Sequence, residues 1–211
     1  MSRGLGDVYK RQILPVNLDA IKKFMIEKNV YHKLNDYIKA SGDLAVKLYK
    51  EDIEAALRTK DFGGFELLSL SDYTGQSTAT VGILDVFYES KGLISHDEFK
   101  NFAGEAVPLF KAKRIFKNTD TLEAELDLYD FGEKKINNPV YNLTVQNGKQ
   151  VFYKTSTTES KVSIPLNSIT KSTMLSVILE VNGYKNTWRI FVFAENKIEN
   201  NVRMIKSEEE L

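Results

Sequence analysis

The sequence predicts an α+β protein of more than one domain, in which a mainly helical part precedes an all-β sandwich. Apolar residues recur at helical spacing up to about residue 106. From Pro108 onward they alternate with polar residues, which is the pattern of strands with one wet face. The short apolar run Phe65–Leu70 lies between helical patterns and is bounded by turn signals, as is typical of a strand buried on both faces. Helix, strand, polar loop and helix together form the unit of an α/β layer or barrel.

The composition narrows the possible classes of function. Of the 211 residues, 42% are hydrophobic and 27% are charged, which is typical of a globular chain. The 29 basic and 29 acidic residues cancel, which argues against a nucleic-acid partner. The absence of cysteine excludes disulfides and thiolate metal sites, and no apolar run is long enough to span a membrane. No phosphate loop, zinc motif or Ser-His-Asp set can be assembled, so we predict no metal and no cofactor.

Residues 1–12 do not look like part of a fold. This stretch, MSRGLGDVYKRQ, has two glycines, three basic residues and no periodicity. It resembles a translated sequencing adapter, and the alternative is a genuine disordered terminus. We assign no function to it in either case.

Two helical segments are predicted next. The first covers Asn17–Asn29, with Asn17 as its N-cap and an apolar stripe of Ile21, Phe24 and Met25. The second covers Tyr31–Thr59, with an interruption at Ser41–Asp43 where a serine cap restarts the helix. We expect both apolar stripes to face a core.

The polar loop that follows the predicted strand is the candidate functional segment. In α/β folds chemistry lies at the C-terminal ends of the strands, which here is Ser71–Gln76. The alternative is a buried strand that ends in a solvated turn without a function. A short helix is predicted over Ala79–Tyr88, continuing to Glu89, and a second over 96–103. Ser95 and Glu98 form a capping box at the start of that second helix.

The C-terminal half predicts an immunoglobulin-like antiparallel sandwich of about seven strands. Asn147-Gly148 and Asn182-Gly183 each separate two alternating runs, and Asn-Gly supplies the positive φ angles of tight hairpin turns. Trp188 is the single tryptophan, and we expect a core residue or a domain contact rather than a platform for a sugar. The alternating or apolar runs are 109–116, 122–128, 141–145, 162–166, 175–181 and 188–194.

One stretch also resembles a known family. The sequence EAALRTKDFGGFELLSLSDYTGQSTATVGILDVFYESKGLISHDEF is similar to the end of the catalytic barrel in glycoside hydrolase family 2-like enzymes. These are relatives of β-galactosidase and β-glucuronidase, in particular large bacterial sugar-binding glycosidases. The family-like features are a Gly-Gly-Phe strand start, an Asp-aromatic-x-Gly-Gln turn and a Gly-x-Leu-Asp-x-Phe helix. The resemblance covers roughly Ile13–Pro108 and continues more loosely into the β-rich half.

The resemblance implies a C-terminal piece of a larger glycosidase. The strand at Phe65 corresponds to the last strand of the barrel, and both catalytic carboxylates of the family would fall upstream of Met1. We therefore predict no catalytic residue in this chain. Glu66 and Asp72 do not replace the missing pair, because they lie ~20 Å apart if the chain is extended.

The resemblance also implies substrate-binding residues at the loop. Carboxylate and amide groups bind sugar hydroxyls, and an aromatic ring covers the apolar side of a pyranose. In the intact enzyme Asp72, Tyr73 and Gln76 would shape the sugar site, with Ser69 and Ser71 as weaker candidates. The predicted partners are a carbohydrate substrate and the missing upstream barrel and sugar-binding domains. A periplasmic or extracellular place in a bacterium is implied by the family alone.

The predicted domain organisation follows from these observations. A non-native or disordered leader covers 1–12, and the C-terminal part of a TIM-barrel domain covers 13–106. An immunoglobulin-like β-sandwich covers 107–196, and a charged tail covers 197–211. The alternative function is a stand-alone immunoglobulin-like module that binds carbohydrate or protein and carries a helical stalk.

Overall fold

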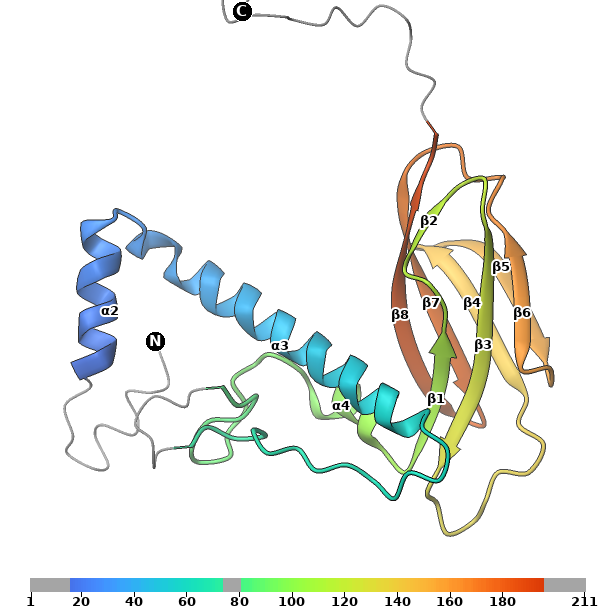
Figure 1. Ribbon diagram of the computed structural model, residues 1–211, viewed down its shortest axis with the longest axis horizontal. Coiled ribbons are helices and arrows are strands. Elements are labelled where there is room, and N and C mark those ends of the chain that lie inside the picture. Colours follow the sequence, from blue (N-terminus) through green and yellow to red (C-terminus); the bar gives the residue numbers. More distant parts are fainter. Residues whose placement is uncertain (1–15, 74–80, 196–211) are drawn as a thin grey trace, which may run out of the picture. The chain divides into compact units, whose positions relative to one another are not determined.

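The computed structural model describes residues 16–73 and 81–195, and it combines helices with two β-sheets (Figure 1). Its contacts divide the chain into two compact units. The first extends to Val107 and also includes Tyr129–Glu133, and the second holds the remaining residues from Pro108 onward. The α+β class and the β-sandwich are therefore confirmed, whereas the described residues form no barrel. None of their helices has both the length and the apolar character that crossing a membrane requires.

The first unit contains the helices α2 (Val16–Glu27), α3 (Leu34–Leu57) and α4 (His96–Ala103), with a 3-10 turn η1 (Tyr31–Lys33) before α3. The predicted interruption at Ser41–Asp43 is wrong, because α3 continues through it. A Cβ at Gly42 would lie 2.3 Å from the Leu93 side chain, so this glycine permits close packing rather than ending a helix.

The predicted buried strand at Phe65–Leu70 is also wrong for this chain. Residues 62–67 have no regular structure, and the side chain of Leu68 is 92% exposed. A strand requires neighbours for its backbone groups. In the described residues a bridge forms only further on, between Ser71 and Leu84.

The helix predicted over Ala79–Tyr88 does not form in its described part, which begins at residue 81. Leu84 instead bridges to Ser71 in parallel and to Ser90 in antiparallel fashion. Asp85 directs the turn between these bridges, because its Oδ1 accepts hydrogen bonds from the N–H groups of Phe87 and Glu89, each at 2.9 Å. A carboxylate that takes backbone N–H groups competes with the helix for them.

The capping box before α4 is confirmed. The N–H of Glu98 donates to Ser95 Oγ at 3.2 Å, and the N–H of Ser95 donates to Glu98 Oε2 at 3.0 Å. The helix covers His96–Ala103 as predicted, and it buries Phe102.

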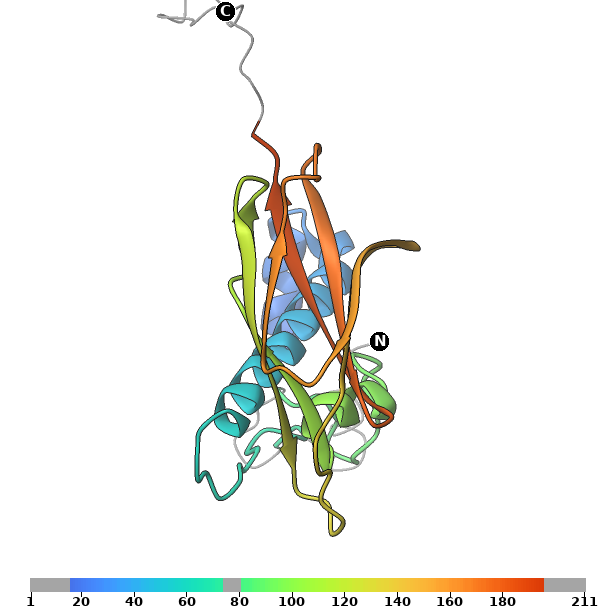
Figure 2. The same ribbon diagram turned by 90° about the vertical axis from the view of Figure 1, so that its right-hand side faces the viewer.

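The second unit is a sandwich of two sheets, in which the strand orders are β1-β3-β6 and β2-β8-β7-β4-β5. Figures 1 and 2 show that the strands run roughly along one common direction. β2 pairs with β8 in parallel, while the pairs β3–β6, β4–β5, β4–β7 and β7–β8 are antiparallel. The strands are β1 (Ala106–Lys111), β2 (Ile115–Lys117), β3 (Thr121–Asp130), β4 (Tyr141–Asn147), β5 (Gln150–Thr157), β6 (Lys161–Pro165), β7 (Thr173–Val181) and β8 (Tyr184–Phe193).

The alternating runs become the strands β3, β4, β6 and β7, and most of their apolar positions are buried. Met174 of β7 is an exposed exception. The run 109–116 is divided between β1 and β2, which belong to different sheets. β5 is the second of the two runs that Asn147-Gly148 separates, and no bounds were predicted for it, because its sequence does not alternate clearly and both of its faces stay partly exposed.

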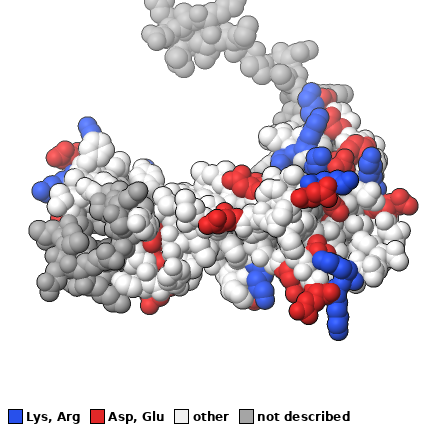
Figure 3. All heavy atoms as spheres, turned by 60° about the horizontal axis from the view of Figure 1, so that its bottom comes forward, with Lys and Arg blue, Asp and Glu red and all other residues white. Residues whose placement is uncertain are grey.

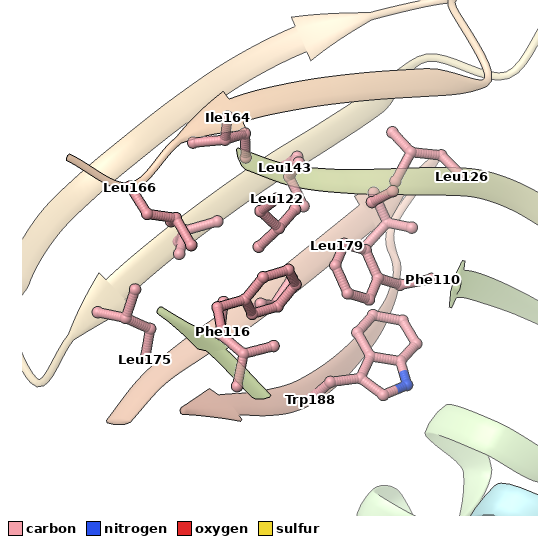
Figure 4. Close-up of a cluster of buried hydrophobic side chains, with 14 of the residues drawn as sticks. Phe110, Phe116, Leu122, Leu126, Leu143, Ile164, Leu166, Leu175, Leu179 and Trp188 are labelled. Atoms are coloured by element: carbon pink, nitrogen blue, oxygen red, sulfur yellow. The ribbon is translucent and has the colours of Figure 1, made fainter. Parts of the chain in front are cut away.

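The core of the sandwich lies between the two sheets (Figure 4). Trp188 is 4% exposed, and its ring lies against Phe110 with the ring centroids 5.4 Å apart. Trp188 is therefore a core residue, and it offers no free face to a sugar. Both hairpin turns are confirmed, with positive φ angles at Gly148 (56°), Asn182 (51°) and Gly183 (89°).

The β7–β8 hairpin predicts a difference between two neighbouring substitutions. Gly183→Ala places a side chain at a positive φ and is expected to lower the free energy of unfolding of the sandwich by about 1 kcal/mol or more. Asn182→Gly keeps a residue that accepts positive φ, and it is expected to change that free energy by less than about 0.5 kcal/mol. Urea unfolding of both variants checks this, and equal losses would contradict the assigned turn.

The capping box predicts that the stability of the chain depends on pH. The N–H of Ser95, and secondly its hydroxyl, lower the pKa of Glu98 from its ordinary value of 4.5. Because the folded-state pKa is the lower one, this stabilisation is complete above the ordinary value and is lost as the pH falls through the lowered value. Between about pH 5 and about pH 3, the melting temperature of the chain should fall further than that of Glu98→Gln, which cannot ionise. If the melting temperatures of the two proteins fell equally with pH, the ionised Glu98 of the capping box would contribute nothing to stability.

Candidate functional site

The candidate site lies in the first unit around Asp72 and Gly82, on either side of residues 74–80, which are outside the described residues. Backbone hydrogen bonds hold the two ends together: the N–H of Asp72 donates to Leu84 O at 3.0 Å, and the N–H of Leu84 donates to Leu70 O at 3.0 Å. A third segment is bonded to the same base, because the N–H of Lys91 donates to Ile83 O at 3.4 Å. Three short stretches of chain thus form the base of the loop.

A buried ion pair crosses this base. Asp72 Oδ1 accepts hydrogen bonds from Lys91 Nζ at 2.6 Å and from the N–H of Gly82 at 2.9 Å. Lys91 Nζ also donates to Gly82 O at 2.8 Å. The Asp72 side chain is 5% exposed and that of Lys91 is 17% exposed. A carboxylate this deeply buried requires a counter-charge and hydrogen bonds, and it receives both here.

Gly82 fits this base because it has no side chain. A Cβ there would lie 2.3 Å from the carbonyl carbon of Ser71 and 2.5 Å from the nitrogen of Asp72. Both are backbone atoms that cannot move aside cheaply. The close approach is what allows the N–H of Gly82 to reach the Asp72 carboxylate.

Helix α3 contributes a second contact to the loop base. The hydroxyl of Tyr49 lies 3.3 Å from Ser69 O and 3.4 Å from Val81 O. These carbonyls lie on the two sides of the loop, so one hydroxyl near both supports the same closed arrangement.

The predicted substrate-binding residues have different environments. Asp72 is buried and paired, and the adjacent Tyr73 is 62% exposed. Ser69 and Ser71 are half-buried and take part in the loop base through their backbones. Gln76 lies outside the described residues. The structure thus pairs Asp72 with Lys91, which was not among the predicted site residues.

A second buried carboxylate lies on α3. Glu54 is fully buried, and its Oε1 is bound by Lys50 while its Oε2 accepts from Arg58 Nη2 at 2.7 Å. The Lys50 ammonium also lies 5.5 Å from the centre of the Phe102 ring. Both oxygens of Glu54 are occupied, so it acts as an internal structural charge. The described residues contain no group of His, Cys, Asp and Glu side chains that could hold a metal ion.

The charge distribution agrees with the neutral composition. Figure 3 shows acidic and basic side chains interspersed over the strand-rich part of the chain. This face presents no broad surface of a single sign, and nucleic-acid binding receives no support from it.

Comparison with known proteins adds one match. A family model described as a domain of unknown function (DUF8488) matches residues 120–194. This range begins just before β3 and ends just after β8, and the description assigns no activity. No curated protein matches the chain.

The close approach at Gly82 predicts an effect of a single methyl group. Gly82→Ala is expected to force the loop base apart and to lower the stability of the first unit by about 1–3 kcal/mol. Gly63→Ala is the matched control, because a Cβ at Gly63 meets no atom within 4 Å. Hydrogen exchange at the amides of Asp72 and Leu84 measures the effect. Equal exchange in the two variants would contradict the assigned packing.

Proposed function

We propose that the chain is the C-terminal part of a glycoside hydrolase of the family 2-like type. In this proposal residues 13–106 complete a catalytic barrel and the sandwich is an accessory domain. The observation that supports the proposal is the base of the 72–82 loop, in which Asp72 is paired with Lys91 and the next residue, Tyr73, is exposed. Carboxylates and aromatic rings are the groups that bind the polar and apolar sides of a sugar.

Exposed apolar residues in the first unit support the same proposal. Phe65 and Leu68 lie in the stretch without regular structure, and helix α3 exposes Leu44 and Leu48. In a completed barrel the stretch would gain strand partners on both sides, and the helix would gain neighbouring helices. Large apolar side chains left in water are a typical sign of a surface that meets another part of a protein.

The proposal assigns the hydrolytic step to residues of the longer protein. Retaining glycosidases place two carboxylates about 5 Å apart, and inverting ones place them farther apart on opposite sides of the bond. Asp72 forms an ion pair with Lys91, while Glu66 is exposed in the stretch 62–67, which has no regular structure. These two residues therefore bind or support rather than cleave.

The second candidate is a stand-alone binding module. It is favoured by the self-contained core of the sandwich and by the family match, which lies within the sandwich and covers β3 to β8. In that case the helical unit would be a stalk, and sugar or protein binding would not depend on upstream residues.

An activity assay distinguishes the part of a glycosidase from the stand-alone binding module. We expect the 211-residue chain to hydrolyse no aryl β-galactoside, β-glucuronide, β-mannoside or β-glucosaminide above the uncatalysed rate. The longer reading frame cloned from the source DNA should turn over at least one of them, because it restores the carboxylate pair.

Two results would contradict the proposal. One is turnover by the 211-residue chain that disappears when one of its own carboxylates is changed. The other is a longer reading frame that adds no barrel and shows no hydrolysis, which would favour the binding module.

A further inference from the structure

An apolar patch lies on the outer face of the five-stranded sheet of the sandwich. The register places its side chains next to one another, because Phe191 pairs with both Ile115 and Met174, and Phe193 follows two residues later on the same face. The residues that follow Ile115, Met174 and Phe191 point the other way and belong to the core. The four side chains of the patch are all exposed: Ile115 (66%) on β2, Met174 (41%) on β7, and Phe191 (42%) and Phe193 (53%) on β8.

The size of this patch indicates what kind of partner fits it. Each of the four side chains has roughly 200 Å² of surface and exposes about half of it, so the patch measures on the order of 400 Å². A stable interface between two proteins takes about 800 Å² from each partner, which is twice as much. The patch is therefore too small for a second protein alone, and it suits one short segment of chain laid across it.

The chain itself continues directly beside the patch. β8 ends at Phe193, and the next residues stay close to the end of β2, because the N–H of Glu195 donates to Asn118 Oδ1 at 3.1 Å. Residues 196–211 are outside the described residues, and their sequence begins NKIENNVRMI. This segment is thus joined to the sandwich only two residues after Phe193, so it reaches the patch without a linker.

The sequence of this segment predicts a short amphipathic helix. Ile198, Val202 and Ile205 recur at i, i+4 and i+7, which is the spacing of one helix face. Asn196 with Glu199 three residues later is the sequence pattern of a helix start. Such a stripe is ~10 Å long at 1.5 Å per residue, and three strands ~4.8 Å apart make the patch ~10 Å wide. The stripe and the patch therefore match in length.

We propose that residues 197–206 form a helix that folds back onto the outer face of the sheet and covers the patch with its apolar stripe. The contact is driven by removing both apolar surfaces from water. Because β2 has only three residues and is an edge strand, the helix also holds β2 against β8. This contact does not depend on the proposed glycosidase function.

A spin label tests where the segment lies. The chain has no cysteine, so Lys206→Cys gives a single attachment point for a nitroxide, beside the predicted stripe rather than in it. A nitroxide broadens the NMR signals of nearby amides, and those of Ser176 and Arg189, next to the patch, are expected to lose intensity. Amides of β6, in the other sheet, should keep theirs. Ile115→Thr removes apolar surface but keeps a strand-forming residue, and it should restore the intensity.

Two results of this experiment would overturn the proposal. One is full intensity at Ser176 and Arg189 in the chain that carries the nitroxide. The other is the same broadening in isotope-labelled chains without a nitroxide, mixed with unlabelled chains that carry one. In that case the patch would be an interface between copies of the chain.

Hydrogen exchange tests the effect on β2. Val202→Asp introduces a charge into the stripe, and Asn200→Asp is the matched control, because it adds the same charge on the opposite face of the predicted helix. Val202→Asp is expected to speed exchange of the Phe191 amide, which donates to Arg114 O at 2.8 Å, by about fivefold. The amide of Leu126, in the other sheet, should keep its rate. Equal exchange of Phe191 in both variants, or an equal rise at Leu126, would contradict the docked helix.

Discussion

The first unit depends on the pairing of its buried carboxylates with cations and N–H groups. Its buried apolar residues are few, and Glu54, Asp72 and Asp85 are buried among them. Each carboxylate is satisfied in its own way: by two cations, by one cation and one N–H, or by two N–H groups of a turn. Because an unpaired buried charge costs several kcal/mol, the chain must follow a path that keeps these partners in place. The sandwich relies instead on a continuous cluster of buried apolar side chains.

This contrast explains which parts of the fold the sequence could predict. Strand alternation is a local signal, so β3, β4 and β7 and the two Asn-Gly hairpins were found directly. The capping box before α4 is equally local, since it joins residues three apart. The run Phe65–Leu70 was misinterpreted because apolar content shows that a segment suits a strand, whereas pairing partners decide whether one forms. Gly42 was misinterpreted because its role is set by Leu93, which is distant in sequence.

The same reasoning applies to the candidate site. Asp72 and Tyr73 could be selected from the sequence, because polar and aromatic residues in a loop after an apolar run are a recognisable pattern. Lys91 could not, since it lies 19 residues from Asp72 and no periodicity connects them. The predicted helix over Ala79–Tyr88 also concealed it, because a helix would not have brought residue 91 back to the loop base. The missing signal was a physical one: a carboxylate that becomes buried requires a cation from elsewhere in the chain.

A buried charged residue outside regular structure needs a support that a helix or a sheet does not supply. On a strand or helix the backbone ladder fixes the direction of a side chain, but the bridges that the described residues of the loop base make to one another, between Ser71, Leu84 and Ser90, are isolated ones. Side-chain contacts must then provide the rigidity, and Lys91 provides it from outside the loop. The ion pair between Asp72 and Lys91 therefore fixes the chain path of this unit where regular structure does not.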